Sequence, residues 1–133
     1  MSGESAHHIR LVEVLIQTVE RDHQMRGGLM VLADHHRFGA DRPPNIGGFQ
    51  PDLFASDVPS TFRILGEAKT PNDLETDRSL RQLLAFFDHL ALYPGSRFYL
   101  AVPFLTAPRA RFILKSIRRP EHDGVAADVL ACV

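Results

Sequence analysis

The first third of the chain combines a helical apolar pattern with a short strand and a long loop. An apolar stripe with spacings of three and four residues predicts a helix over residues 7–24, which Gly27 and Gly28 would end. The stripe consists of Ile9, Val12, Ile16 and Val19. The apolar run at 29–34 predicts a buried strand. The glycines and prolines of residues 35–50 predict a loop, and loops of this length are more often functional or mobile than idle.

Two strand-like runs come next, "DLFASD" at 52–57 and "TFRILGEAK" at 61–69, and they predict a β-hairpin around Val58, Pro59 and Ser60. The later elements are a turn-like segment at 70–77, in which Thr76 or Asp77 caps a helix at 78–92, a strand at 97–103, a helix at 106–119 that opens at Thr106, and a final strand or docked tail at 125–133. This order predicts an α/β protein in which helices cover both faces of a mixed sheet.

Composition narrows the functional classes. The chain has 133 residues, which predicts one domain over 1–133, and it lacks an apolar run of about 18 residues that would predict a membrane span. Polar residues at the start stand where a signal peptide would be apolar, so we expect a cytoplasmic protein without a membrane partner. Cys132 is the only cysteine, which argues against a disulfide framework or a cysteine-based zinc site within one chain.

The charge balance argues against nucleic acid coating the whole surface, because the formal net charge is −1, from 15 basic and 16 acidic residues. A local basic face stays open, since residues 106–120 contain no acid. The basic residues of this segment are Arg109, Arg111, Lys115, Arg118 and Arg119. Arginine favours bidentate contacts with carboxylate or phosphate, and a solvated helix face explains the same residues equally well.

The hairpin carries charges at positions that ordinarily hold apolar residues. A tight turn centred between Pro59 and Ser60 places Asp52 directly opposite Glu67, with Lys69 on the same face. Two such carboxylates repel each other unless one is protonated or a cation lies between them. Hard divalent cations prefer oxygen ligands, and a nearby lysine can position water and stabilise phosphate, so the triplet indicates phosphodiester hydrolysis. A cross-strand salt bridge on an exposed face is the alternative.

Pro51-Asp52, a 14-residue spacer and Glu67-Ala68-Lys69 resemble the motif of the PD-(D/E)XK, or restriction-endonuclease-like, nuclease superfamily. The family core is a helix, three strands of which the second and third carry the motif, a helix and a fourth strand. The same order is expected here over residues 7–103. The resemblance is nearest to Holliday-junction-resolvase-like and virus-type replication-repair nucleases. It implies a restriction-endonuclease-like αβββαβ core with an added helix and C-terminal strand.

The resemblance also implies roles for the motif residues. Asp52 and Glu67 would bind Mg²⁺, or Mn²⁺ in its place, and the carbonyl group of Ala68 would be a further ligand. Lys69 would orient and activate the attacking water. Gln82, on the following helix, would support the site or contact the scissile backbone, and a surface glutamine is the alternative.

The similar families also place a glutamate on the first helix. Glu13 is the first choice for this metal ligand because it borders the apolar stripe and follows Val12 directly. Glu20, two turns further along, and Glu4 remain alternatives. An ordinary solvated acid explains Glu13 equally well.

Several basic residues are candidates for contacts with nucleic acid, although solvated side chains explain them equally well. They are Arg78, Arg81, His36 and Arg37. Two histidine pairs, His7-His8 and His35-His36, lack the i, i+4 spacing of a helical zinc site, so we expect them to be loop or surface histidines.

These features together predict a metal-dependent endonuclease or exonuclease, acting on DNA because most of the similar families cut DNA. So short a chain leaves little surface for sequence readout, which favours structure-specific or non-specific cutting. A homodimer would present two such sites. Two alternatives stay open. One is a catalytically inactive restriction-endonuclease-like module that binds DNA or a protein, and the other is an RNA-directed or toxin-like nuclease.

Overall fold

The computed structural model describes residues 6–24 and 28–133, and its main helices and strands follow the predicted order. The elements are α1 (Ala6–Asp22), β1 (Met30–Ala33), β2 (Leu53–Ser56), β3 (Arg63–Ala68), α2 (Pro71–Leu74), α3 (Asp77–Leu90), β4 (Arg97–Pro103), α4 (Ala107–Ile117) and β5 (Ala126–Cys132). Short 3₁₀ turns are η1 (His36–Phe38), η2 (Phe104–Thr106) and η3 (Pro120–His122).

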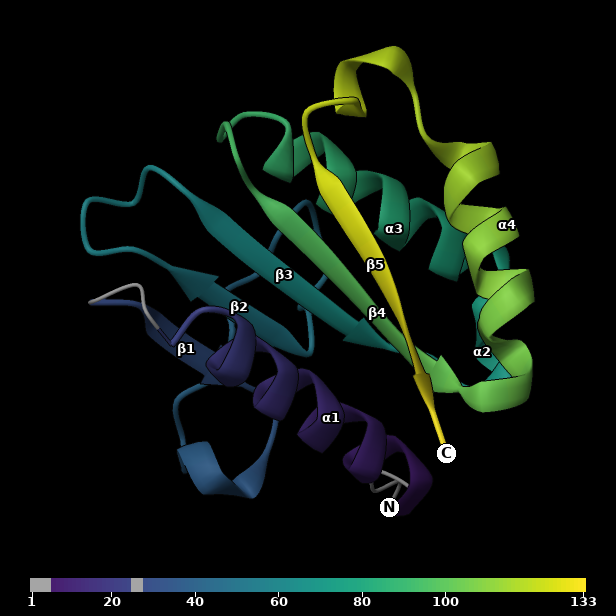
Figure 1. Cartoon of the computed structure of the whole chain (residues 1–133), viewed down its shortest axis with the longest axis horizontal. Helices are drawn as coiled ribbons and strands as arrows, with labels where there is room; N and C mark the ends of the chain where they lie inside the picture. Colours follow the sequence, from purple (N-terminus) through teal and green to yellow (C-terminus); the bar gives the residue numbers. More distant parts are fainter. Residues whose placement is uncertain (1–5, 25–27) are drawn as a thin grey trace.

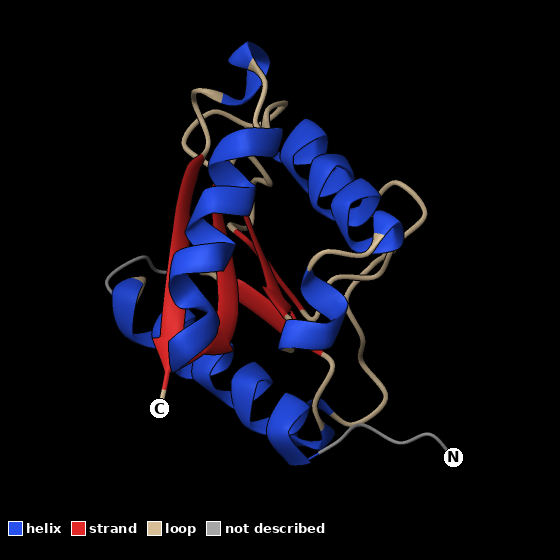
Figure 2. Ribbon diagram, turned by 90° about the vertical axis from the view of Figure 1, so that its right-hand side faces the viewer, coloured by secondary structure: helices blue, strands red, loops and turns tan. Residues whose placement is uncertain are grey.

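A five-stranded mixed sheet in the order β1-β2-β3-β4-β5 forms the centre of the fold. β1, β2 and β3 pair antiparallel, whereas β3, β4 and β5 pair parallel, as the helical crossovers through α3 and α4 require. Helix α1 covers one face, and α3 and α4 cover the other (Figures 1 and 2). The predicted α/β class, with its mixed sheet between helices, is confirmed.

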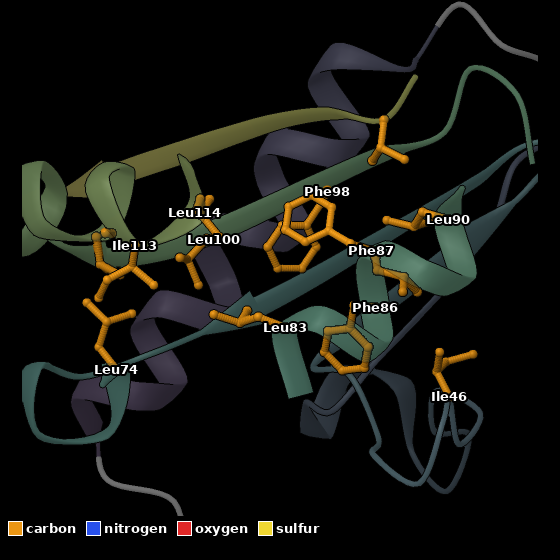
Figure 3. Close-up of a cluster of buried hydrophobic side chains, with 14 of the residues drawn as sticks. Ile46, Leu74, Leu83, Phe86, Phe87, Leu90, Phe98, Leu100, Ile113 and Leu114 are labelled. Carbon is orange, nitrogen blue, oxygen red and sulfur yellow. The ribbon is translucent and has the colours of Figure 1, made fainter. Parts of the chain in front are cut away.

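Each face of the sheet has its own apolar core. Between the sheet and α3 and α4, a cluster that includes Phe86, Phe87 and Phe98 is fully buried (Figure 3). On the opposite face, Leu11 and Leu15 of α1 are buried against the sheet, and burial of this kind stabilises by about 1.5–3 kcal/mol per large side chain. The helices of both layers are apolar on one side, and across the described residues none is long and apolar enough to cross a membrane.

The apolar stripe of α1 differs in part from the prediction. Ile9, which was expected to start the stripe, is 37% exposed, and Leu11 and Leu15 are buried in its place. The stripe is therefore centred on Leu11, Val12 and Leu15, and Ile9 lies at its margin. The helix ends at Asp22, two residues earlier than predicted, and Gly27 lies outside the described residues.

The hairpin has the predicted register with a longer loop. Leu53 pairs with Gly66 and Ser56 with Arg63, so Asp52 lies opposite Glu67 as predicted. The strands are joined by residues 57–62 rather than by a tight turn. The carboxylate of Asp57 closes this loop by accepting hydrogen bonds from the backbone N–H groups at positions 61 and 62. The longer loop takes the same number of residues from the end of each strand, so the pairing of the remaining residues is unchanged.

Two segments contain more regular structure than the sequence predicted. Within the predicted turn, Pro71 starts the one-turn helix α2, since proline fits the first turn of a helix, where its missing N–H costs nothing. Thr76 then caps α3, accepting a hydrogen bond from the N–H of Ser79, as predicted. The predicted loop at 35–50 contains η1 and an isolated bridge between Ile46 and Phe49.

Candidate active site

The carboxylates of Asp52 and Glu67 each accept a hydrogen bond from the backbone of the facing strand at the end of the β2–β3 hairpin. The backbone N–H of Asp52 donates to Glu67 Oε1 at 3.2 Å, and the N–H of Ala68 donates to Asp52 Oδ2 at 2.9 Å. The two carboxylates thus continue the strand pairing beyond Leu53, where the backbone ladder of β2 ends. Both carboxylates are buried, with exposures of 8% for Asp52 and 5% for Glu67. One oxygen of each carboxylate remains for other partners.

Lys69 and Gln82 complete the cluster from the two adjoining elements. Lys69 follows β3 directly, and its N–H donates to the carbonyl of Ala101 in β4, which extends the parallel pairing by one residue. Its Nζ lies 3.4 Å from Glu67 Oε2 and donates to Gln82 Oε1 at 2.5 Å. Gln82 is buried on the side of α3 that faces the sheet. The structure therefore brings together Asp52, Glu67, Lys69 and Gln82, four residues that the sequence had singled out.

Alternation along β3 explains why these charges share a face. Leu65 packs in the core beneath α3 and α4, while Ile64 and Ala68 pack against α1. Because successive side chains of a strand point to opposite faces, Glu67 points to the same side as Leu65, toward α3 and α4. The site is consequently covered by helices, and an exposed cross-strand salt bridge does not describe it.

Burial dominates the electrostatics of Glu67. It raises the pKa of this carboxyl well above the usual value, the nearby carboxylate of Asp52 raises it further, and Lys69 acts in the opposite direction. One ammonium group faces two carboxylates, so full ionisation leaves a net negative charge in a place that water hardly reaches. Either a proton or a cation must offset that charge.

Replacement of Glu67 by glutamine is expected to remove a pH-dependent loss of stability. A carboxyl whose pKa is raised by folding stabilises the folded state at low pH, and that contribution is lost as the pH rises above 4.5 and through the raised pKa. In EDTA, wild-type protein should therefore lose stability between pH 5 and pH 8 relative to Glu67→Gln, and the variant should be more stable by about 1 kcal/mol at pH 8. Urea unfolding at both pH values measures this, and a difference independent of pH would contradict it.

His8 is a member of the site that the sequence reasoning missed. It lies in the first turns of α1, and its Nε2 is 3.5 Å from Asp52 Oδ1, the oxygen that Ala68 does not engage. His8 is therefore a half-buried helix residue, which departs in part from the expectation of a loop or surface histidine. Its position three residues before Leu11 and four before Val12 places it on the buried side of the helix, and this spacing was the available signal.

The predicted helix glutamates have other partners. Glu13 Oε2 lies 3.0 Å from His35 Nε2, and Glu20 forms an ion pair with Arg37 at 2.7 Å. Five residues correspond to about 140° of rotation in a helix of 3.6 residues per turn, so Glu13 points well away from His8. The structure does not bring either glutamate to Asp52. Glu4, the third candidate, lies outside the described residues.

His35 is also more than a surface residue. It lies in the predicted loop but is only 9% exposed. Its Nδ1 accepts the N–H of Arg37, so Nε2 carries the proton and donates to Glu13. His35 thus ties the loop after β1 to α1, which supports the fold near the site without entering it.

The residues predicted to contact nucleic acid lie outside the cluster. Arg78 lies over the ring of Phe49 at 5.2 Å, and Arg37 forms a fork with Glu20, which raises the pKa of the guanidinium. His36 is exposed, and its ring centroid is 4.2 Å from that of His35. Arg81 is exposed, and in the described part of the chain no hydrogen bond or ion pair engages it. Their role in binding stays a prediction.

A second group that could hold a metal ion lies at the other end of α3. Ligand atoms of Asp88, Glu121 and His122 lie within 4.8 Å of one another. His122 is fully buried, its Nδ1 accepts the N–H of Arg119, and its Nε2 is 2.7 Å from Asp88 Oδ1. Nε2 must therefore carry the proton and donate it to Asp88, which leaves the ring no lone pair for a metal. We interpret this group as a structural link between α3 and η3.

The fold and the cluster together define an α/β protein with a mixed five-stranded sheet between helices and a buried group of charges at the end of its β2–β3 hairpin. Among solved structures, SfsA of Pyrococcus furiosus in complex with Ca²⁺ is similar, with 15% sequence identity and a TM-score of 0.51. The match covers 92% of this chain and 57% of the SfsA chain, so this chain spans little more than half of that protein. No protein-family model matches the chain, and no curated protein matches it in sequence. At this identity, the likeness shows the fold.

Proposed function

We propose that the chain is a metal-dependent nuclease of the PD-(D/E)XK type, which hydrolyses phosphodiester bonds in DNA by structure-specific or non-specific cutting. The observation that carries the proposal is the buried cluster in which Lys69 lies between the carboxylate of Glu67 and the amide of Gln82, with Asp52 opposite. Buried charges of this kind are costly to a fold, and strongly shifted pKa values concentrate at functional sites.

The donor set fits a hard divalent cation. Asp52 Oδ1 and Glu67 Oε2 are the oxygens that the reciprocal backbone hydrogen bonds leave available, and the raised pKa of Glu67 indicates a need for positive charge. Mg²⁺ binds one or two carboxylates of this kind. The carbonyl of Ala68 and the imidazole of His8 would be the neighbouring donors. The Ca²⁺ bound by the similar SfsA chain is a further reason to test such cations first.

A bound cation would supply Lewis acidity to a phosphodiester and lower the pKa of water. The other steps fall to residues of the chain. Lys69 Nζ, fixed by Gln82 Oε1, would orient the attacking water and donate a hydrogen bond to the phosphate oxygen that gains charge. Gln82 would keep this ammonium from closing completely on Glu67. The helices over this face would exclude bulk water, which strengthens each of these interactions.

A cleavage panel tests this function. Supercoiled, linear, single-stranded and branched DNA, and RNA, would each be incubated with Mg²⁺, with Mn²⁺ or with EDTA. We expect cutting of at least one DNA substrate that requires the metal and stops in EDTA. Cutting that persists in EDTA would contradict the proposal, and cutting of RNA alone would reassign the substrate.

A second experiment separates His8 from Glu13 as the donor on α1. His8→Ala should weaken Mn²⁺ binding about 10-fold or more, because it removes a nitrogen beside Asp52. Glu13→Gln keeps an acceptor for His35 and should leave the Mn²⁺ affinity within about twofold, the range of substitutions away from a site. Calorimetric titration measures both. A strong effect of Glu13→Gln together with none from His8→Ala would reverse the assignment in favour of the glutamate.

One observation favours a second candidate, the catalytically inactive binding module. The reciprocal hydrogen bonds give Asp52 and Glu67 a structural task at the end of the hairpin, which a fold could retain without any chemistry. The two candidates differ in their response to metals. If no substrate is cut and calorimetry detects neither Mg²⁺ nor Mn²⁺ binding, the module is the better account.

A further inference from the structure

A groove runs between α4 and the outer strand β5, away from the Asp52 cluster. It has a volume of about 470 Å³ and is lined by Arg111, Leu114, Lys115, Arg118, Ala127, Asp128 and Val129. A second hollow of about 560 Å³, lined in part by Arg119 and Asp123, shares Lys115 and Arg118 with it. The two hollows therefore form one continuous surface, which we name the α4–β5 groove.

The groove is strongly basic. Arg111 and Lys115 are spaced i, i+4, which places them on one side of α4, and Arg118 follows the last residue of the helix and lines the same groove. Of the two acids that line the groove, Asp128 is already neutralised by Arg97 at 2.5 Å, and Asp123 is exposed at its far end. Positive charge therefore dominates the surface that a ligand would meet.

Two of these cations are free to bind a ligand. Arg111 and Lys115 are exposed, and among the described residues neither has a hydrogen bond or an ion pair. Arg109, on the same helix, is engaged by Glu75. Arg118 is held in place, since it donates to two carbonyl groups of the chain after α4 and lies over the ring of Phe87 at 5.1 Å. The groove thus pairs one fixed guanidinium with two available side chains.

The free edge of β5 adds donors beside these cations. In the described sheet β5 pairs only with β4, so the backbone N–H groups on its outer side have no strand partner. Phosphate oxygens accept hydrogen bonds from backbone N–H groups as well as from arginine and lysine. A strand of a second copy could also pair here, but a symmetric contact would bring two basic grooves together, which repulsion disfavours.

We propose that the α4–β5 groove binds the phosphate backbone of nucleic acid at a distance from the point of cutting. Helix α4, which lines the groove, lies with α3 over the face of the sheet to which Asp52 and Glu67 point (Figure 1). The groove is therefore on that face but beyond β4. The choice of nucleic acid over other polyanions rests on the proposed nuclease function. Only a substrate that extends past the catalytic cluster reaches the groove, so the groove selects for long substrates and contributes no sequence readout.

Nucleic-acid binding in EDTA tests the groove without any cutting. Fluorescence anisotropy would compare wild-type protein, Arg111→Glu/Lys115→Glu, and the charge-matched control Arg10→Glu/Arg21→Glu on α1, at several salt concentrations with long and short DNA. The groove variant should lose about 10-fold or more in affinity for long DNA, and its salt slope should fall by about 1.4–1.8, the value for two phosphate contacts. The control should keep the slope and most of the affinity. Arg111→Gln/Lys115→Gln, which adds no negative charge, repeats the test if the first variant folds poorly by circular dichroism.

Several outcomes would contradict the proposal that the groove binds nucleic acid. Equal losses of DNA affinity in the groove and control variants would show a general charge effect. A loss of affinity confined to Arg78→Glu/Arg81→Glu would place the phosphate backbone of the DNA on α3 instead. If wild-type protein binds no nucleic acid, the surface belongs to another partner. If the groove variants instead change the oligomeric state measured by light scattering, that partner is a second copy of the chain. Failure of the groove is separate from failure of the proposed function. If cutting depends on Asp52 while groove variants bind normally, only the groove is wrong.

Discussion

Replacing Lys69 with alanine is expected to lower the single-turnover rate of phosphodiester cleavage by about 10²–10⁴-fold, the range that a positioned proton-transfer or charge-stabilising group contributes. Among the described residues, the ammonium group of Lys69 is the one cation that forms an ion pair with Glu67, at 3.4 Å, and Gln82 fixes its direction. Alanine removes both the donor to the substrate and the charge that offsets the carboxylates. The rate at saturating protein reports this loss independently of substrate affinity.

Lys115 provides the control because it is the other lysine of the chain and is exposed on α4. Lys115→Ala should leave the single-turnover rate at saturating protein unchanged, even where it weakens binding. Circular dichroism and thermal unfolding would confirm that both variants fold. Equal rates for Lys69→Ala and wild-type protein would remove Lys69 from the mechanism.

The second large effect is expected from Asp52→Asn, which should weaken Mn²⁺ binding by about 100-fold or beyond the range of calorimetry. Asparagine keeps an oxygen that can accept the N–H of Ala68, so the hairpin should remain closed. The substitution removes one of two negative charges and the oxygen that faces His8. Loss of binding without loss of fold is therefore the signature of a ligand.

Asp57→Asn is the matched control for this substitution. Asp57 is a half-buried aspartate of the same hairpin that also accepts backbone N–H groups, and it lies at the opposite end of the strands. Asp57→Asn should reduce the stability of the fold modestly and leave the Mn²⁺ affinity unchanged. If both variants bind Mn²⁺ as wild-type protein does, the cation is held elsewhere, and the group at Asp88 and Glu121 would be examined next.

The sequence was sufficient to predict the centre of the site because strand pairing is periodic. A cross-strand register places Asp52 against Glu67, and the observed pairing of Leu53 with Gly66 confirms it although the loop is longer than expected. Lys69 follows by alternation along β3. Gln82 came from the family resemblance, and its inward position on α3 agrees with the helical spacing of its apolar neighbours.

The contribution of α1 could not be predicted in the same way. Periodicity shows which side of a helix is buried, but not which residue of that side reaches the end of another element. His8 contacts Asp52 because the first turns of α1 pack beside the start of β2. This contact depends on tertiary packing. Glu13 was selected from the family resemblance and from its place beside the apolar stripe, but it lies on a side of α1 where His35 is its partner.

The α4–β5 groove shows a similar limit. The basic residues of 106–119 were visible in the sequence, but their partners were not. Glu75, directly after α2, engages Arg109, and backbone carbonyls engage Arg118. Arg111 and Lys115 face a groove that exists only because β5 docks beside α4. Which cations are available for a ligand depends on these contacts.

Cleavage of supercoiled DNA by wild-type protein and Asp52→Asn, prepared in parallel and assayed with Mn²⁺ and with EDTA, tests the central claim most directly. The account predicts nicked or linear product from wild-type protein with Mn²⁺, none in EDTA, and none from Asp52→Asn at the same concentration. Equal cutting by the two proteins, or cutting that persists in EDTA, would contradict a metal-dependent site at Asp52.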